Sequence, residues 1–100
     1  MAEALILEFA GLDKPTYLKV NEALGIDQAT GKGDWPAGLL SHTGAEGPDG
    51  FVVFEIWDSK ESQDQFMNDR LGAALQQAGV GGPPRRAEWL EIAGHNTLGA

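Results

Sequence analysis

One stretch constrains the fold of this chain more than any other: the apolar segment Phe51–Trp57, which runs directly into a helical pattern. It is dense in β-branched and aromatic residues, the side chains that fit a pleated sheet best. Because alternate residues of a strand point to opposite faces, both faces of this segment are largely apolar. The pattern predicts a central strand that is covered on both sides, with Glu55 as the one charge inside it.

A helix is expected to follow this strand over residues 59–78. Asp58 and Glu61 have the spacing of a helix N-cap and its capping-box partner. An apolar stripe then recurs at helical spacing, formed by Met67, Leu71, Ala74, Leu75 and Ala78. Gly79 stands where a glycine is expected to end the helix.

The rest of the chain supplies the partners of this unit. Strands are expected at residues 4–9, 38–43 and 86–93, and the pattern of the first helix begins at the cap Asp13 and ends at Gly25. Residues 26–37 have turn chemistry throughout and predict a loop, in which Trp35 should fold over another part of the molecule. In the strand 38–43, strict alternation places Leu40 and His42 on one face and Leu39, Ser41 and Thr43 on the other.

The predicted order is therefore strand, helix, strand, strand, helix, strand, in one domain over residues 1–100. This is the ferredoxin-like βαββαβ pattern of the α+β class, a four-stranded antiparallel sheet with both helices on one face. Since the strands carry bulky residues on both faces, the uncovered face needs a cover. A second copy of the chain is the simplest one, which predicts a symmetric homodimer closed by packing of the two sheets.

Charge and composition exclude several classes of partner. The net charge of −8 and a pI near 4.5 argue against nucleic acid and anionic membranes. The absence of cysteine excludes disulfides, thiolate chemistry and cysteine-bound zinc. The first residues lack the basic segment of a signal peptide, and no apolar stretch approaches the ~20 residues that span a bilayer. A soluble cytoplasmic protein is expected.

The turn Trp57-Asp-Ser-Lys-Glu61, Phe66 beyond it and the order of elements together resemble the dimeric α+β barrel superfamily, in particular its antibiotic biosynthesis monooxygenase-like branch. The segment Pro36-Ala-Gly-Leu-Leu-Ser-His-Thr-Gly44 looks like a feature that recurs in small uncharacterised members of actinobacterial type. The resemblance spans nearly the whole chain.

This superfamily includes cofactor-free oxygenases of aromatic polyketides, haem-degrading enzymes, polyketide cyclases, isomerases and proteins without known activity. The resemblance therefore implies a fold and a pocket between helices and sheet, not one reaction. It implies that Trp57 lines that pocket. Haem-degrading members carry a histidine iron ligand on a helix, and residues 59–78 contain none, so neither haem nor another cofactor is expected.

His42 and Glu55 are the candidate catalytic residues. Histidine takes or gives a proton near neutral pH, and His42 is the only one on a predicted element, since His95 lies in the tail. The alternative is a strand histidine that bonds a backbone carbonyl or a neighbouring glutamate. With no second histidine nearby, no metal site is expected.

Glu55 belongs to a set with Glu8 and Glu91, because all three lie mid-strand on strands that are adjacent in ferredoxin-like order. If all three point to one face, they either raise each other's pKa or bond to a shared partner, and a carboxylate with a raised pKa can do acid–base work. The alternative is a polar layer paired with Arg85, lysine or water.

Aromatic and amide side chains complete the candidate site. Tyr17, Trp35 and Trp57 are the candidate substrate-binding aromatics, because flat ligands favour aromatic walls; the alternative is that they are core residues. Asn21 faces either the pocket or solvent.

Two classes of function follow. The first is an enzyme that acts on a small aromatic or polyketide-like molecule, either as a cofactor-free monooxygenase or as a cyclase or isomerase using acid–base chemistry. The second is a non-catalytic accessory dimer that holds a small apolar or aromatic ligand.

Overall fold

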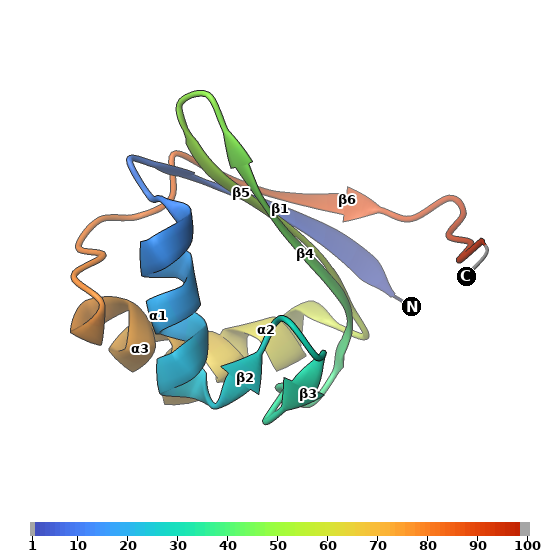
Figure 1. Cartoon of the computed structure of the whole chain (residues 1–100). Helices are drawn as coiled ribbons and strands as arrows, with labels where there is room; N and C mark the ends of the chain where they lie inside the picture. Colours follow the sequence, from blue (N-terminus) through green and yellow to red (C-terminus); the bar gives the residue numbers. More distant parts are fainter. Residues whose placement is uncertain (1, 99–100) are drawn as a thin grey trace.

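The computed structural model describes residues 2–98. Its long strands are β1 (Glu3–Ala10), β4 (Leu39–Gly47), β5 (Gly50–Trp57) and β6 (Arg86–Glu91). They form one antiparallel sheet in the order β4-β5-β1-β6, so the strand predicted to be central has a partner on each side. Both helical segments lie against the same face of this sheet (Figure 1). The α+β, ferredoxin-like architecture predicted from the sequence is confirmed.

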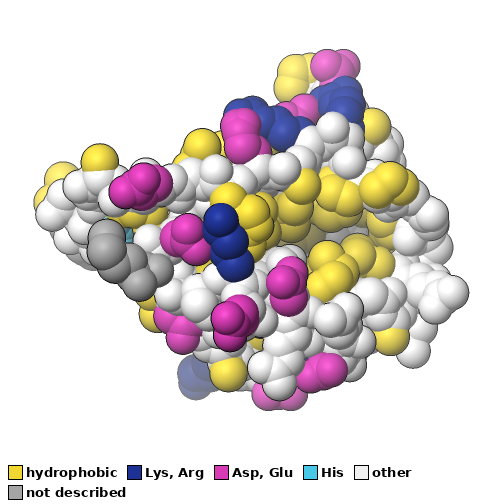
Figure 2. All heavy atoms as spheres, turned by 180° about the vertical axis from the view of Figure 1, so that it is seen from behind, with side chains coloured by type: hydrophobic (Ala, Val, Ile, Leu, Met, Phe, Trp, Pro, Cys, Tyr) yellow, Lys and Arg dark blue, Asp and Glu magenta, His cyan; other side chains and the backbone are white. Residues whose placement is uncertain are grey.

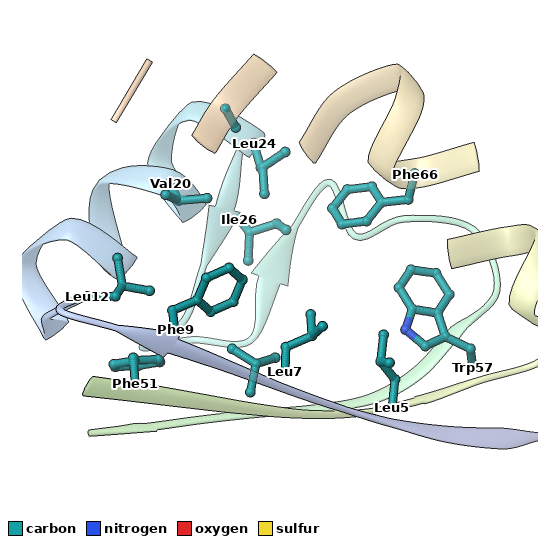
Figure 3. Packing of buried hydrophobic residues seen from close by; sticks show 12 residues of the cluster. Leu5, Leu7, Phe9, Leu12, Val20, Leu24, Ile26, Phe51, Trp57 and Phe66 are labelled. Atoms are coloured by element: carbon teal, nitrogen blue, oxygen red, sulfur yellow. The ribbon is translucent and has the colours of Figure 1, made fainter. Parts of the chain in front are cut away.

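The core lies between that sheet face and the helices. Leu5, Leu7 and Phe9 of β1 point toward the helices, and the register places them opposite inward-facing residues of β5. In Figure 3, Phe9 lies below Val20 of the first helix, whereas Leu5 lies beside Trp57. Most of the buried hydrophobic residues of the described chain lie on β1 and β5, so this strand pair forms the floor of the core.

Helix α1 (Lys14–Leu24) begins and ends where the sequence predicts. The side chain of Asp13 accepts a hydrogen bond from the Thr16 amide at 2.9 Å, which satisfies one of the free donors of the first turn. Pro15 sits in that turn, where the missing N–H costs nothing. Gly25 ends the helix with a φ of 77°, a left-handed conformation that favours glycine.

The second helical segment differs from the prediction in two ways. Its N-cap is Ser59, not Asp58, because the Ser59 hydroxyl accepts from the Ser62 amide at 3.2 Å. Asp58 is used otherwise: its amide donates to the carbonyl of Gly38, and its carboxylate accepts from the Ser62 hydroxyl. The helix is also not uniform, since a π-helical turn η1 (Met67–Leu71) separates α2 (Lys60–Phe66) from α3 (Gly72–Gln77).

This π-turn changes which residues of the segment are buried. Each π-turn inserts an extra residue per turn and rotates the helix face. Phe66 enters the core beside Ala74, whereas Met67, predicted as the first residue of the apolar stripe, does not belong to the core cluster. The other four residues of the predicted stripe, Leu71, Ala74, Leu75 and Ala78, do lie in or against the core, so the prediction was wrong only at Met67.

The region predicted as a loop, residues 26–37, contains a small two-stranded ribbon. β2 (Ile26–Asp27) pairs with β3 (Lys32–Gly33), and the Asp34 amide donates to the Gly25 carbonyl at 2.9 Å. We call residues 26–37 the flap. Its two-residue strands are too short to show a period in the sequence. At the other end of the chain, the last strand stops at Glu91, two residues before the predicted end.

Strand β4 is longer than predicted, and its faces differ from strict alternation. Its register against β5 pairs Leu39 with Trp57 but Ser41 with Ile56, so Leu40 is an extra, bulged residue. A bulge reverses the alternation on one side of it. As a result Leu39 and His42 share the inner face, while Leu40 is 62% exposed. The prediction that Leu40 and His42 share one face of the strand was wrong.

The sheet face opposite the helices has no covering layer among the described residues (Figure 1). Phe54 and Leu90 lie on that face and are each 38% exposed.

On the rear of the molecule, apolar side chains gather in a hollow that is bordered by acidic and basic groups (Figure 2). Within residues 2–98, no helix has the length and apolar character needed to cross a bilayer.

Candidate functional site

A cavity of about 60 Å³ lies between the inner face of the sheet and the helices. Most of its wall is hydrocarbon, from β1, α1, the flap and the second helical segment. Four polar side chains interrupt that wall: Tyr17, Asn21, His42 and Glu55. All four are residues that the sequence predicted for the site. The cavity admits only a few water molecules as it stands, since each needs about 10–15 Å³.

Three of these polar residues form a continuous hydrogen-bonded chain. The Tyr17 hydroxyl lies 2.5 Å from His42 Nε2, and His42 Nδ1 lies 2.8 Å from Glu55 Oε2. The other carboxylate oxygen of Glu55 accepts from Trp57 Nε1 at 3.0 Å. Glu55 and His42 are both withdrawn from solvent, with side chains 8% and 11% exposed. A phenol, an imidazole and a carboxylate are thus held in line at one end of an apolar cavity.

The backbone explains why these side chains meet. His42 and Glu55 are direct partners in the β4–β5 register, and the bulge at Leu40 turns His42 toward the helices. Tyr17 reaches them from the first turn of α1, across Gly44. A Cβ at Gly44 would come within 2.6 Å of the Tyr17 ring and hydroxyl, so the glycine leaves the space that the phenol occupies.

The direction of the hydrogen bonds follows from the chemistry of the groups. A carboxylate only accepts, so His42 Nδ1 carries the hydrogen that bonds Glu55. In a neutral ring Nε2 is then the acceptor and takes the hydrogen bond of the Tyr17 hydroxyl. Burial raises the pKa of the Tyr17 phenol above its usual range, and the nearby charge of Glu55 acts in the same direction. Tyr17 therefore holds its proton near neutral pH.

Asn21 faces the cavity and is 5% exposed, which settles its orientation in favour of the pocket. Its Nδ2 donates to the Tyr17 carbonyl at 2.8 Å, and its Oδ1 accepts from Gln28 Nε2 at 3.1 Å. The amides of Asn21 and Gln28 partly oppose the rise in the Tyr17 pKa. The sequence analysis did not single out Gln28, whose position on the flap has no recognisable pattern.

The two candidate tryptophans take different places. Trp35 belongs to the flap and lines the cavity together with Pro36, and its ring centroid lies 5.6 Å from that of His42. Trp57 is fully buried and packs against Phe66 (Figure 3), but it does not line the cavity. Its contact with the site is its hydrogen bond to Glu55, so it orients the carboxylate from behind.

The three strand glutamates do not form a cluster. Glu8 lies on the outer face, where it pairs with Arg85 and Arg86, and Glu91 is exposed on the edge strand. Only Glu55 reaches the cavity. In residues 2–98 no group of three or more His, Asp or Glu side chains has a metal-binding arrangement, and His95 is exposed in the tail.

Comparisons with known proteins identify related folds. No family model and no curated protein matches the chain at the level of sequence. The fold is similar to a candidate antibiotic biosynthesis monooxygenase from Chloroflexus aurantiacus, with a TM-score of 0.64, 15% identity and coverage of 99% of this chain and 100% of that one. Rv0793 from Mycobacterium tuberculosis gives a TM-score of 0.60 at 17% identity, covering 97% and 100% of the two chains.

A monooxygenase from the gene ActVA-Orf6 of Streptomyces coelicolor, solved with the ligand nanaomycin D, has a TM-score of 0.57 at 22% identity. The match covers 98% of this chain and 92% of that one. At these identities the likeness concerns the fold, which confirms the predicted resemblance to antibiotic biosynthesis monooxygenase-like proteins at that level. What the site does has to be argued from its own residues.

Proposed function

We propose that this chain is an enzyme that takes a proton from a small aromatic or polyketide-like molecule bound in the cavity, as the first step of a cofactor-free monooxygenation. The observation that carries the proposal is the hydrogen-bonded chain from Tyr17 through His42 to Glu55, which ends at an otherwise apolar wall. Titratable side chains that are withdrawn from water and hydrogen-bonded to one another at the wall of a cavity are typical of acid–base sites.

The hydrogen-bonded chain of side chains defines a route for the proton. Because burial raises the pKa of Tyr17, a free phenolate is not stored in the resting site. Tyr17 therefore passes its proton to His42 Nε2 as its oxygen takes one from the substrate. The imidazolium that forms is stabilised by Glu55 across the 2.8 Å hydrogen bond. Trp57 and the β4–β5 register hold Glu55 in place for this role.

The reaction that follows needs only O₂ as a co-substrate. A methylene next to a carbonyl and aromatic rings loses a proton to form a stabilised carbanion, which can give electrons to O₂. The methylene becomes a carbonyl, one oxygen atom enters the product and the other leaves as water. Atoms and electrons balance without a cofactor. The likeness to the Streptomyces coelicolor monooxygenase supports this choice of reaction class.

A cyclase or isomerase is the second candidate, and the same proton route favours it. Such reactions move a proton between two positions of one molecule and need no O₂. A non-catalytic binder is the third, and the small size of the cavity is consistent with it.

Anthrone, a three-ring ketone with an acidic methylene, is a suitable probe. We expect the protein to accelerate O₂ uptake and the formation of anthraquinone, and His42→Gln to lower the rate by about 10²–10⁴-fold, the usual contribution of a general base. His95→Gln is the matched control, because His95 is exposed and does not line the cavity.

The outcomes separate the candidates. Tautomerisation of anthrone without O₂ uptake would favour the acid–base isomerase. Binding without either reaction would favour the accessory role. An acceleration that His42→Gln and His95→Gln lower equally would contradict the proposed site.

We also propose that two chains associate through the outer face of the sheet. Phe54 and Leu90 are exposed there, and a sheet that is apolar on both faces is stabilised by a second layer. Native mass spectrometry of the purified protein tests this proposal. A mass of two chains is expected, and a clean monomer at micromolar concentration would contradict it.

A further inference from the structure

Arg70 does not belong to the hydrogen-bonded chain of the site, but it contacts the flap, which forms part of the cavity wall. The residue belongs to the π-turn η1, and its Nη2 donates to two backbone carbonyls, that of Leu24 at 2.8 Å and that of Asp34 at 2.6 Å. Leu24 is the last residue of α1, whereas Asp34 follows the ribbon of the flap. One guanidinium group thus ties together two segments that are separated by the whole β2–β3 ribbon.

Several physical terms favour this position for a cation. The carbonyl of Leu24 is among those that a helix leaves without an internal partner, and α1 has no basic residue in its own last turn. The guanidinium also lies 5.4 Å from the centroid of Phe66, which lines the cavity, and 3.4 Å from the Asp34 carboxylate. Arg70 therefore supplies the positive charge that the last turn of α1 lacks, and it contacts both the flap and the cavity wall.

Two flap residues that line the cavity follow Asp34 directly in sequence. Trp35 and Pro36 come immediately after Asp34, and Trp35 lies against His42. Gly38, the residue that follows the flap, is held separately, because its carbonyl accepts from the Asp58 amide at 2.8 Å. Gly38 is also tightly packed, because a Cβ there would come within 2.6 Å of Ser62. Within the flap, Gln28 is bonded to Asn21 of α1, whereas Arg70 is the side chain that holds Asp34, directly before Trp35.

We propose that Arg70 is a positioning residue that latches the flap over the cavity and so determines the size of the ligand that the site accepts. The cavity as it stands has room for a few waters only, so a molecule with fused rings requires its wall to move, and Trp35 and Pro36 are wall residues that the flap carries. Moving them means breaking the contacts of Arg70 with Asp34, which lie at the surface and are accessible to water. The part of this inference that concerns ligands depends on the proposed function; the latch itself does not.

Amide hydrogen exchange measures the latch without any ligand. The Asp34 amide, bonded to Gly25, reports the part of the flap that Arg70 contacts, and the Asp58 amide, bonded to Gly38, reports the chain just after the flap. In Arg70→Met we expect exchange at Asp34 to accelerate at least about tenfold, the effect of losing hydrogen bonds to a charged donor. Exchange at Asp58 and at the Trp57 indole should change by less than about twofold.

Lys60→Met is the matched control, because Lys60 is a cation on the same helical segment but lies over Trp89, 5.8 Å from its ring centroid. It should leave the exchange of Asp34 unchanged. Arg70→Lys keeps the charge but loses the planar fork, so an intermediate acceleration is expected, and this variant serves if Arg70→Met does not fold. Equal exchange at Asp34 in the wild type and the Arg70 variants, or equal acceleration at all sites, would overturn the latch.

A two-ring phenol, 1-naphthol, then tests the link to ligands. We expect it to associate with Arg70→Met faster than with the wild type, while association with Lys60→Met is unchanged. If association is the same in all three proteins although Asp34 exchange accelerates, the role in ligand selection is refuted. If 1-naphthol and anthrone bind none of them, the proposed function fails and the latch stands on the exchange data.

Discussion

Trp57→Phe tests how strongly the site is tied to the core. The indole of Trp57 is fully buried and donates to Glu55, which is itself 6% exposed. Phenylalanine removes that donor and leaves a buried carboxylate oxygen without a partner, a loss of about 1.5–3 kcal/mol for a hydrogen bond to a charged group. The smaller ring also leaves a cavity, which costs about a further 1–2 kcal/mol. Together these terms lower the free energy of unfolding by about 2.5–5 kcal/mol.

A loss of this size is large beside the ~5–15 kcal/mol that stabilise a typical domain. In a chain of 100 residues it should lower the melting temperature by at least about 10 °C. Urea titrations followed by circular dichroism measure it directly. Trp89→Phe is the matched control, because Trp89 is half-buried on the edge strand β6 and should cost less.

A double-mutant cycle isolates the hydrogen bond from the packing. On a Glu55→Gln background the acceptor is neutral, so Trp57→Phe should cost about 1 kcal/mol less than it does in the wild type. A cost no greater than that of Trp89→Phe, or a coupling indistinguishable from zero, would refute the view that Trp57 holds Glu55.

The remaining predictions concern titration and assembly. Tyr17 is the only tyrosine of the chain, so absorbance near 295 nm in an alkaline titration reports its ionisation alone. The midpoint should lie above the ordinary tyrosine pKa of about 10. A midpoint at or below that value would contradict the buried site. Because this pKa is raised in the folded state, the associated stability is present below the unfolded value and is lost as pH rises through the folded one. The hydrogen bonds of Thr16 lower the pKa of the Asp13 carboxyl, so the stability that this helix cap contributes is present above the unfolded pKa and is lost in acid. Asp13→Ala should therefore lower the urea midpoint at pH 7 but not at pH 2. Equal losses at both pH values would argue against the cap. Phe54→Glu should convert a dimer to monomers in sedimentation without unfolding the chain, since Phe54 is exposed on the outer face; an unchanged dimer would place the interface elsewhere.

The sequence predicts the architecture well because its main signals are local and strong. The dense apolar strand Phe51–Trp57, the cap Asp13 and the terminal Gly25 each specify an element through short-range physics, and all three are confirmed. The site residues are brought together by the order of the strands, which places Glu55 of the central strand beside β4.

What the sequence does not show depends on register and on irregular backbone. The bulge at Leu40 changes which side chains accompany His42, and no residue pattern marks it. The π-turn Met67–Leu71 likewise shifts the buried face of a helix whose sequence has an acceptable uniform period. Arg70 and Gln28 contribute through contacts with segments distant in the chain, which only the folded structure reveals.

The direction of the proton chain is the central claim, and the tautomer of His42 tests it most directly. Long-range ¹H–¹⁵N spectra distinguish the two ring nitrogens, and His95→Gln assigns the signals. When the His42 ring of the wild type is neutral, we expect Nδ1 to carry the hydrogen and Nε2 to be an acceptor. In Glu55→Gln the amide can donate to Nδ1, so the hydrogen should move to Nε2, and His42 can no longer accept the proton of Tyr17. The same tautomer in both proteins, or an Nε2-protonated ring in the wild type, would contradict the account.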